Sequence, residues 1–222
     1  MSDHIAGPNV DGFFIPDYPG RLVAQKKVDS TVQVIVAHNS NEGLLFTDPR
    51  IQDQAGFKSY FAALMPSISS TKIDQLANTV YPPDYSGAQP YINPTQRVTL
   101  AIGEALINCL AFGLDTAYNN ATRGYQFAAF PGVHAQDVPY TFWNGETTDS
   151  FGLPVNGTIA QKMQSWFTDF TILGTTGTSA ALQLPTYGSQ ATVLNITGNG
   201  FPTDRDPAAN SRCNFWLTGL YS

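Results

Sequence analysis

The sequence predicts an α/β fold, in which parallel strands are flanked by helices. Two observations lead to this prediction. Residues 31–37 and residues 125–130 are almost entirely apolar, and the first run is rich in β-branched side chains, which is typical of strands covered on both faces. Between them, residues 94–118 carry apolar side chains at helical spacing. A helix between two buried strands favours a parallel sheet.

The predicted elements follow one another along the chain in a simple order. They are a turn at 10–16, a strand at 31–37, helices at 57–64, 71–80 and 94–118, a strand at 125–130, a helix at 158–174, a strand at 191–196 and a C-terminal helix at 214–217. Thr71 with Asp74 three residues later resembles a capping box, and Thr158 is the expected N-cap of the later helix. We find no internal repeat and no domain-scale linker, so 1–222 is treated as a single domain.

Composition limits the class of protein. The chain has 222 residues and is 42% hydrophobic, which is ample for one packed core. The net charge is −6 with only 11 Lys and Arg and no basic cluster, which excludes a typical nucleic-acid-binding protein. The sequence contains no run of about eighteen apolar residues, so no transmembrane segment is predicted. No grouping of His, Asp or Glu has metal-binding spacing, so we expect neither a metal nor another cofactor.

Several features favour a secreted protein. Charged residues make up 13% of the chain, about half the roughly 25% usual in soluble domains. Glycosylation sequons begin at Asn120, Asn156 and Asn195, and attached glycans would solubilise such a surface. The start, Met1-Ser2-Asp3-His4, is not a signal peptide, because it lacks a basic start and an apolar core. We therefore expect an extracellular protein whose front part, including its signal peptide, is absent from this sequence.

The two cysteines, Cys109 and Cys213, are too far apart for a zinc or redox motif. They are either two buried free thiols or one disulfide that closes a long loop. The secretory features favour the disulfide, since such bonds persist in oxidising compartments.

Two polar side chains follow the two buried strands. Glu42 lies on the loop after the first, and His134 lies just past the second, where Pro131 and Gly132 break the run. The carboxyl ends of parallel strands are where catalytic groups gather, and an acid followed by a histidine matches the chain order of a hydrolase triad. The non-functional alternatives are that Glu42 is a surface carboxylate and that His134 is an ordinary loop histidine. Asp137 competes for the role of acid, but we expect it to cap the following turn.

The other two histidines are expected to have no catalytic role. His38 lies at a strand end before Glu42, where a structural role is expected, and His4 lies near an unanchored start and is expected to be inert.

Several motifs, in order, resemble the type-B carboxylesterase (cholinesterase/lipase) branch of the α/β-hydrolases, and most of all its secreted fungal esterases. The matching stretches are Val10-Asp11-Gly12-Phe13, Asn39-Ser40-Asn41-Glu42-Gly43-Leu44-Leu45-Phe46, Tyr125-Gln126-Phe127, Pro131-Gly132-Val133-His134, Trp166-Phe167-Thr168-Asp169-Phe170, Leu184-Pro185-Thr186-Tyr187 and Cys213-Asn214-Phe215-Trp216. The ordered set is more specific than any one stretch, and it covers almost the whole chain.

The resemblance implies hydrolysis of small-molecule or lipid esters without a cofactor. It implies that Glu42 is the triad acid, that His134 is the triad base, and that Cys109 and Cys213 form a family disulfide. The family usually has Gly after its histidine, where this chain has Ala135.

The resemblance also implies that the chain is the C-terminal portion of the α/β-hydrolase fold, with the N-terminal half absent. No Gly-x-Ser-x-Gly elbow occurs, and the nearest string, Gly177-Thr178-Ser179-Ala180-Ala181, follows His134 and is expected to be a loop. These residues alone are therefore expected to be inactive. A non-catalytic binding or adhesion module is the alternative, although the retained acid and base argue against it.

Overall fold

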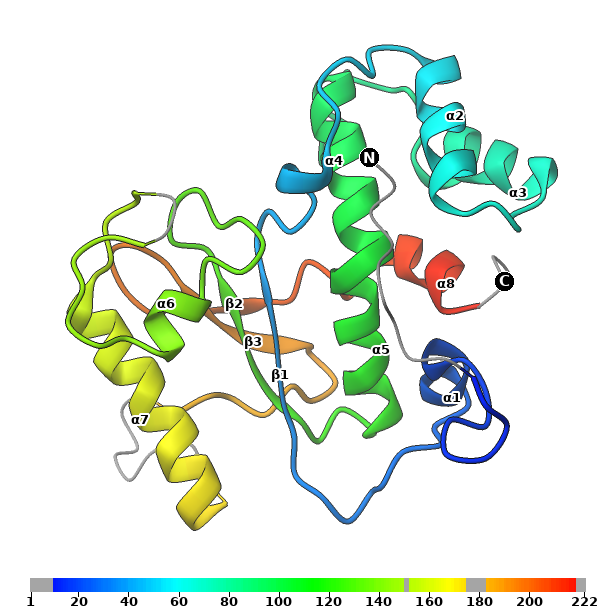
Figure 1. Ribbon diagram of the computed structural model, residues 1–222. Coiled ribbons are helices and arrows are strands. Elements are labelled where there is room, and N and C mark those ends of the chain that lie inside the picture. The colour runs from blue at the N-terminus through cyan, green and yellow to red at the C-terminus, as the bar shows by residue number, and fades with distance from the viewer. Residues whose placement is uncertain (1–9, 150–151, 175–182, 219–222) are drawn as a thin grey trace.

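The computed structural model describes residues 10–149, 152–174 and 183–218, and it has a four-stranded sheet with helices on both faces (Figure 1). The strands are β1 (Ile35–Asn39), β2 (Arg123–Phe127), β3 (Thr192–Ile196) and β4 (Thr203–Arg205), in that spatial order. The first three run parallel, as predicted, whereas β4 pairs antiparallel with β3. Strand β4 was not predicted, because its three exposed polar residues carry no apolar pattern.

The predicted helices are present with shifted ends, and three short helices at 19–24, 44–46 and 138–141 were not predicted. In chain order, the helical elements are α1 (Pro19–Ala24), the 3₁₀ turn η1 (Leu44–Phe46), α2 (Gln54–Leu64), α3 (Ser70–Gln75), the π-helical segment η2 (Leu76–Val80), α4 (Pro94–Gly103), the π-helical segment η3 (Glu104–Asn108), α5 (Cys109–Ala117), α6 (Val138–Thr141), α7 (Gly157–Leu173) and α8 (Ser211–Leu217).

Both predicted N-caps were wrong by two residues. The side chain of Ser69, not Thr71, accepts a hydrogen bond from the Lys72 nitrogen at the start of α3. Asn156, not Thr158, caps α7 by accepting from the nitrogens of residues 158 and 159. In both cases a second capping residue type stands just upstream, and the backbone there is extended, which is the geometry that a cap requires.

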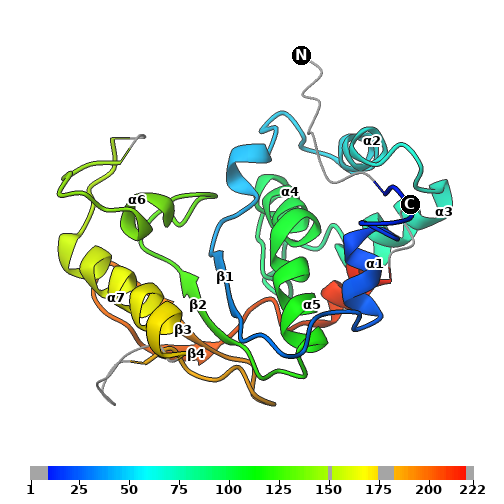
Figure 2. The same ribbon diagram turned by 60° about the horizontal axis from the view of Figure 1, so that its bottom comes forward.

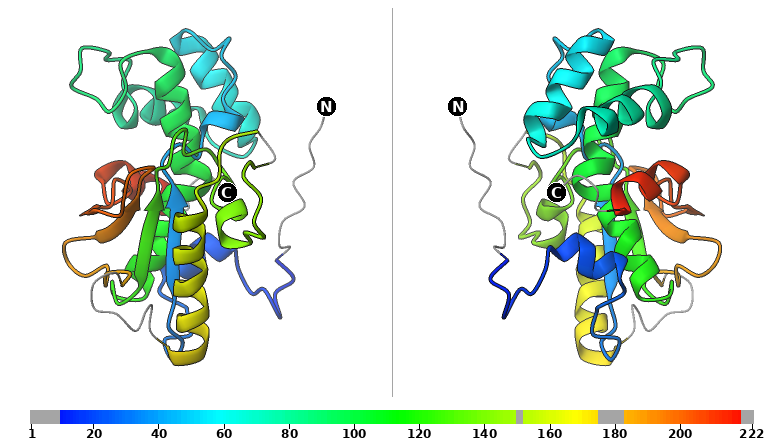
Figure 3. Two further views of the ribbon diagram at one scale, coloured as in Figure 1. Left: turned by 90° about the vertical axis from the view of Figure 1, so that its left-hand side faces the viewer. Right: turned by 90° about the vertical axis from the view of Figure 1, so that its right-hand side faces the viewer.

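The two faces of the sheet are covered differently (Figure 2). On one face, Tyr125, Phe127, Leu194 and Ile196 pack with Met163 and Trp166 of α7. On the other face lies the rod formed by α4, η3 and α5. Helices α2 and α3 lie beyond the end of the sheet at which β1 leads into η1 (Figure 3). Their core, which includes Phe57 and Phe61, is joined by Trp216 of α8.

The continuous rod from Pro94 to Ala117 is long and apolar enough to cross a membrane, with a mean hydropathy of 1.5 in its most apolar window. However, 61% of that window is buried inside the fold. The rod also carries three buried charged-type side chains, Arg97, Glu104 and Asp115, each with a polar partner. We therefore interpret it as a core helix.

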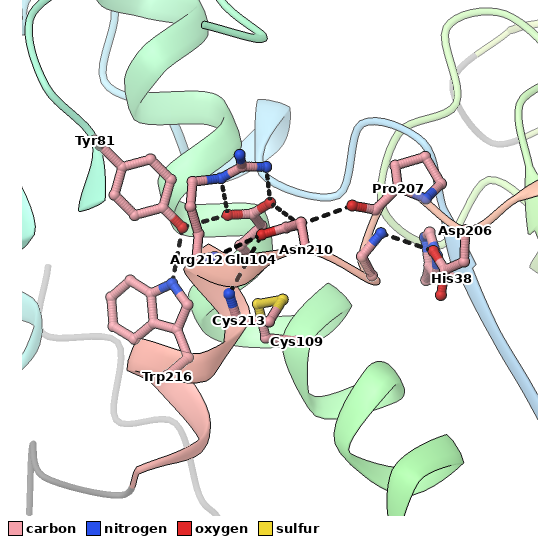
Figure 4. A network of polar contacts seen from close by, with 11 residues as sticks. His38, Tyr81, Glu104, Cys109, Asp206, Pro207, Asn210, Arg212, Cys213 and Trp216 are labelled. Atoms are coloured by element: carbon pink, nitrogen blue, oxygen red, sulfur yellow. Dashed lines mark hydrogen bonds and ion pairs between the residues drawn. A yellow bond between two sulfur atoms is a disulfide. The ribbon is translucent and has the colours of Figure 1, made fainter. Parts of the chain in front are cut away.

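A disulfide joins Cys109 at the start of α5 to Cys213 of α8, with 5.0 Å between their Cα atoms. The second link is Arg212, which donates from Nε and Nη2 to the two carboxylate oxygens of Glu104. Asn210 caps α8 and also donates to Glu104. Together these contacts fix the C-terminal helix against the rod (Figure 4).

Candidate active site

The two loops that carry the predicted site residues lie side by side. They follow β1 and β2, which are parallel neighbours in the sheet, so both begin at the carboxyl end of the strands. The backbone nitrogen of Ser40 donates to Phe127 O (2.9 Å), and that of Asn41 donates to Gly132 O (2.7 Å). A further parallel bridge joins Asn41 to Val133. Strand-like pairing therefore continues past the strands and holds the loops in register.

Glu42 and His134 meet across this junction. The Nδ1 atom of His134 lies 2.6 Å from Oε2 of Glu42, and the other carboxylate oxygen accepts from the backbone nitrogen of Asn39 at 2.6 Å. Glu42 is 4% exposed, whereas the His134 side chain is 43% exposed. Because a carboxylate only accepts, Nδ1 carries the proton in the neutral ring, and Nε2 is left as the basic nitrogen.

The segment around His134 is held by buried amides. Oε1 of Gln136 accepts from the nitrogens of Gly132 (2.7 Å) and Val133 (3.1 Å), and the Gln136 side chain is buried. Nδ2 of Asn39 donates to Val133 O at 2.7 Å. The ring of Phe46 lies 5.3 Å from the His134 ring, centroid to centroid. These contacts restrict the segment that carries the imidazole.

The Glu42 loop packs directly against the backbone of α4. A Cβ atom placed on Gly43 would lie 1.9 Å from Thr99 O and 2.7 Å from the nitrogen of Gly103. A Cβ atom on Gly103 would in turn lie 2.8 Å from the nitrogen of Gly43. Gly103 lies inside the rod, and the lack of a side chain at this position permits the close approach.

The competing acid lies elsewhere. The carboxylate of Asp137 accepts from the hydroxyl of Tyr125 (3.1 Å) and from Nδ2 of Asn39 (3.3 Å). Asp137 is the N-cap residue of α6, as predicted, but its side chain makes no cap bond there, and the backbone oxygen accepts from the nitrogens of residues 140 and 141 instead. His38 is buried and its Nε2 lies 2.9 Å from Asp206 Oδ1, whereas His4 lies outside the described residues.

Two side chains that hold these loops, Asn39 and Gln136, were not predicted from the sequence. Asn39 lies at the end of β1, and Gln136 lies two residues after His134, so their signal was a polar residue beside each predicted site residue. Asn and Gln side chains do not titrate, and no sequence motif indicates which backbone groups their amides will bind.

Exposed apolar side chains lie on the segments that carry the pair. The segments that carry Glu42 and His134 also carry the exposed side chains of Leu44, Leu45, Phe46, Phe130 and Phe142. A cavity of about 310 Å³ borders Glu42 on the side of α4, with Thr99 and Asn108 among its lining residues. Within residues 10–149, 152–174 and 183–218, no group of three or more His, Cys, Asp or Glu could hold a metal ion.

Known proteins are similar to this chain over nearly its whole length. Carboxylesterase patB of Penicillium expansum is 31% identical over 214 residues, which cover 96% of this chain and 37% of patB. Carboxylesterase patB of Aspergillus clavatus is 28% identical over 212 residues, covering 96% of this chain and 38% of that protein. The crystal structure of Aspergillus niger EstA matches with a TM-score of 0.78 and 20% identity, over 96% of this chain and 44% of EstA. No family model matches the chain.

The chain is similar to the type-B carboxylesterases over nearly its whole length. Its sheet and helices are part of the α/β-hydrolase fold of those esterases. The chain spans less than two fifths of the length of the patB carboxylesterases. The activity of a whole esterase is therefore treated below as a proposal. The string Gly177–Ala181, predicted as a loop, lies outside the described residues.

Two further relatives bear on activity and location. The inactive carboxylesterase-like protein VdtD of Byssochlamys spectabilis is 25% identical over 73% of this chain and 32% of VdtD. A secreted lipase of Arthroderma benhamiae is 26% identical over 75% of this chain and 33% of the lipase. The relatives thus include proteins named as carboxylesterases, one named as inactive and one named as a secreted lipase.

Proposed function

We propose that this chain supplies the acid and the base of a Ser-Glu-His triad for the hydrolysis of carboxylic esters. The observation that supports this most directly is the 2.6 Å contact between Glu42 Oε2 and His134 Nδ1. The contact joins a buried carboxylate to a half-exposed imidazole whose other nitrogen is available as a base.

Each residue has a definite role in the proposed reaction. Nε2 of His134 takes the proton of the serine hydroxyl as its oxygen attacks the ester carbonyl, and then passes that proton to the leaving alcohol. A water molecule, deprotonated by the same nitrogen, then releases the acid and restores the serine. Glu42 keeps the Nδ1 proton in place and stabilises the imidazolium that forms in each step.

The nucleophile is proposed to come from residues outside this sequence. No Gly-x-Ser-x-Gly elbow occurs in the 222 residues, and the relatives are much longer than the chain. The oxyanion donors, each worth about 10²–10³ in rate, would come from the same region. Expressed alone, the chain should therefore hydrolyse no ester.

The test compares the chain with the longer protein that contains it. We expect turnover of p-nitrophenyl esters by the longer protein, loss of that turnover in His134→Ala, and none by the soluble, monomeric 222-residue chain. His4→Ala is the matched control, because it removes a histidine with no proposed role. Turnover by the chain alone that disappears in His134→Ala would overturn the proposed division of the triad, and an inactive longer protein would overturn the enzymatic proposal.

A binding or adhesion module without catalysis is the second candidate, and the relationship to VdtD favours considering it. The two candidates differ in whether a serine elbow precedes the Glu42 segment. Reading the frame upstream of Met1, and labelling the longer protein with a fluorophosphonate that reacts with activated serines, separates them. Absence of both the elbow and the label would favour the binding module.

We further propose that the protein is secreted and glycosylated at Asn120, Asn156 and Asn195. The secreted relative supports the location. Asn156 is exposed at the start of α7, whereas Asn120 and Asn195 are half-buried. Mass measurement before and after glycosidase treatment of protein from a eukaryotic host, with each Asn→Gln variant, would count the glycans site by site.

A further inference from the structure

His38 is a buried histidine whose two ring nitrogens both face acceptors. Its Nδ1 lies 3.1 Å from the backbone oxygen of Asn39, and its Nε2 lies 2.9 Å from Oδ1 of Asp206 (Figure 4). The residue is 4% exposed. A carbonyl oxygen cannot donate a hydrogen bond, so Nδ1 must carry a proton.

The second proton follows from the surroundings of Asp206. Its Oδ1 accepts from the backbone nitrogen of Ala208 at 2.8 Å, and its Oδ2 accepts from the hydroxyl of Tyr187 at 2.8 Å. With the imidazole included, the carboxylate has three donors, a set that favours its charged form. The proton shared with His38 therefore lies on Nε2, and the ring is an imidazolium.

We propose that His38, held as a buried imidazolium by Asp206, is a positioning residue for Glu42. This rests on the proposed esterase function, because it assigns a role in the same site. The links form one chain of contacts. His38 Nδ1 donates to the carbonyl of Asn39, whose nitrogen donates to Glu42 Oε1, and Glu42 Oε2 holds His134. The position of Asn39 thus determines how the triad acid is aimed.

The position of Asp206 explains what His38 is anchored to. Asp206 lies between β4 and α8, two residues after Asp204 and next to Pro207, whose oxygen accepts from Asn210, the cap of α8. The end of β1 is thereby tied to the C-terminal helix.

The titratable groups that face His38 are all acidic. They are the carboxyl groups of Asp206, Glu42 and Asp115. Burial alone would lower the pKa of His38, but its hydrogen bond and charge interaction with Asp206 outweigh burial and raise that pKa. Burial would raise the pKa of Asp206, but the bonds from His38 lower it below its ordinary value.

A substitution at Asp206 tests the chain of contacts. In Asp206→Asn, the amide oxygen must stay where Ala208 and His38 donate, so the amide nitrogen points to Tyr187. His38 then loses its charge and keeps its proton on Nε2, and the bare Nδ1 faces the carbonyl of Asn39. Repulsion between these two atoms should displace Asn39 and weaken the contact between Glu42 and His134. Asp115→Asn is the matched control, since Asp115 is also buried nearby but makes no hydrogen bond to His38.

Nitrogen and proton NMR of the imidazoles in the full 222-residue chain provides the measurement, and only three histidines need assignment. We expect His38 to give the signature of two protonated nitrogens at neutral pH in the unmodified chain and in Asp115→Asn. We expect a far-downfield Nδ1 proton signal from His134 in both, and its loss in Asp206→Asn.

Two outcomes would overturn the proposal. One is a neutral His38 in the unmodified chain, which needs no variant to fold. The other is an unchanged His134 signal in folded Asp206→Asn. These NMR signals do not depend on turnover. An inactive longer protein would therefore count against the proposed function, but the role of His38 could still be judged from the spectra.

Discussion

The backbones of Gly43 and Gly103 are in direct contact, so that the residue after the proposed acid rests on the rod without an intervening side chain. A methyl group on Gly43 would lie 1.9 Å from Thr99 O. Gly43→Ala must therefore push the Glu42 loop away from α4. We expect a loss of about 3 kcal/mol in the free energy of unfolding, the upper range of overpacking costs.

The matched control for that substitution is Gly20→Ala in α1, where an added Cβ would meet no atom within 4 Å. Urea unfolding of both variants checks the expectation. Equal stability of Gly43→Ala and Gly20→Ala would mean that the contact is softer than its geometry indicates.

Glu42→Gln should disable His134 while leaving the fold intact. The backbone nitrogen of Asn39 requires an acceptor, so the glutamine oxygen should turn toward it and the amide nitrogen toward His134. That nitrogen donates to Nδ1 and moves the imidazole proton to Nε2, where it blocks the base. By analogy with the serine protease triad, kcat should fall by about 10⁴ in the longer protein.

Glu146→Gln is the matched control, because it removes a carboxylate charge from an exposed loop. Measuring kcat and KM for both variants separates the loss of the proposed acid from a general loss of carboxylate charge. A rise in KM with an unchanged kcat would contradict the proposed role.

The strands and the proximity of Glu42 to His134 could be predicted because each depends on local pattern. Buried parallel strands leave apolar runs, and the loops after them carried the only glutamate and histidine in suitable positions. The predicted ends were displaced, from 31–37 to Ile35–Asn39 and from 125–130 to Arg123–Phe127. Apolarity marks burial, whereas strand ends are set by pairing, and that pairing extends through polar His38 and Asn39.

The long-range supporting contacts could not be predicted, because they join residues far apart in the chain. His38 and Asp206 are separated by 168 positions, and Asn39 reaches Val133 across 94. Nothing local to either partner indicates the other. The Gly43–Gly103 approach is likewise a property of two elements that meet only in the folded chain.

Ala135→Gly should stabilise the chain. Ala135 has a φ of 65°, in the left-handed region that costs an L-residue roughly 1–2 kcal/mol. Glycine adopts this conformation without that cost, but it adds freedom to the unfolded chain. The net gain expected is about 0.5–1 kcal/mol, measured by urea unfolding. Ala160→Gly, within α7, is the control and should instead destabilise by about 1 kcal/mol.

Removing the disulfide should destabilise the fold strongly. The bond joins residues separated by 104 positions, for which the loop-entropy model gives about 4.7 kcal/mol. The contacts of Arg212 with Glu104 remain and should keep α8 docked in part. Comparing the unmodified chain with the double variant Cys109→Ala, Cys213→Ala by thermal unfolding checks the size of the effect. Addition of reductant should lower the melting temperature of the former alone.

The stability of the chain should decrease from acidic to neutral pH. Burial raises the pKa of Asp115 to about 7, with Asp206 adding to the rise, although a hydrogen bond from Thr122 and the charge of His38 oppose it. A carboxyl whose pKa is raised on folding stabilises the fold in its protonated form. That contribution is complete below about pH 4 and is lost as the pH rises through about 7, on the order of 4 kcal/mol in all.

Asp115→Asn should therefore flatten this dependence, because the amide resembles the protonated acid and does not titrate. The raised pKa of His38 adds a loss of the same sign above pH 6.5, and this part should survive in the variant. Urea unfolding at pH 4.5, 6 and 7.5 would separate the two contributions, with the exposed Asp204→Asn as the control that keeps the original dependence. If Asp115→Asn retained the full loss between pH 4.5 and 6, another buried group would have to be its source.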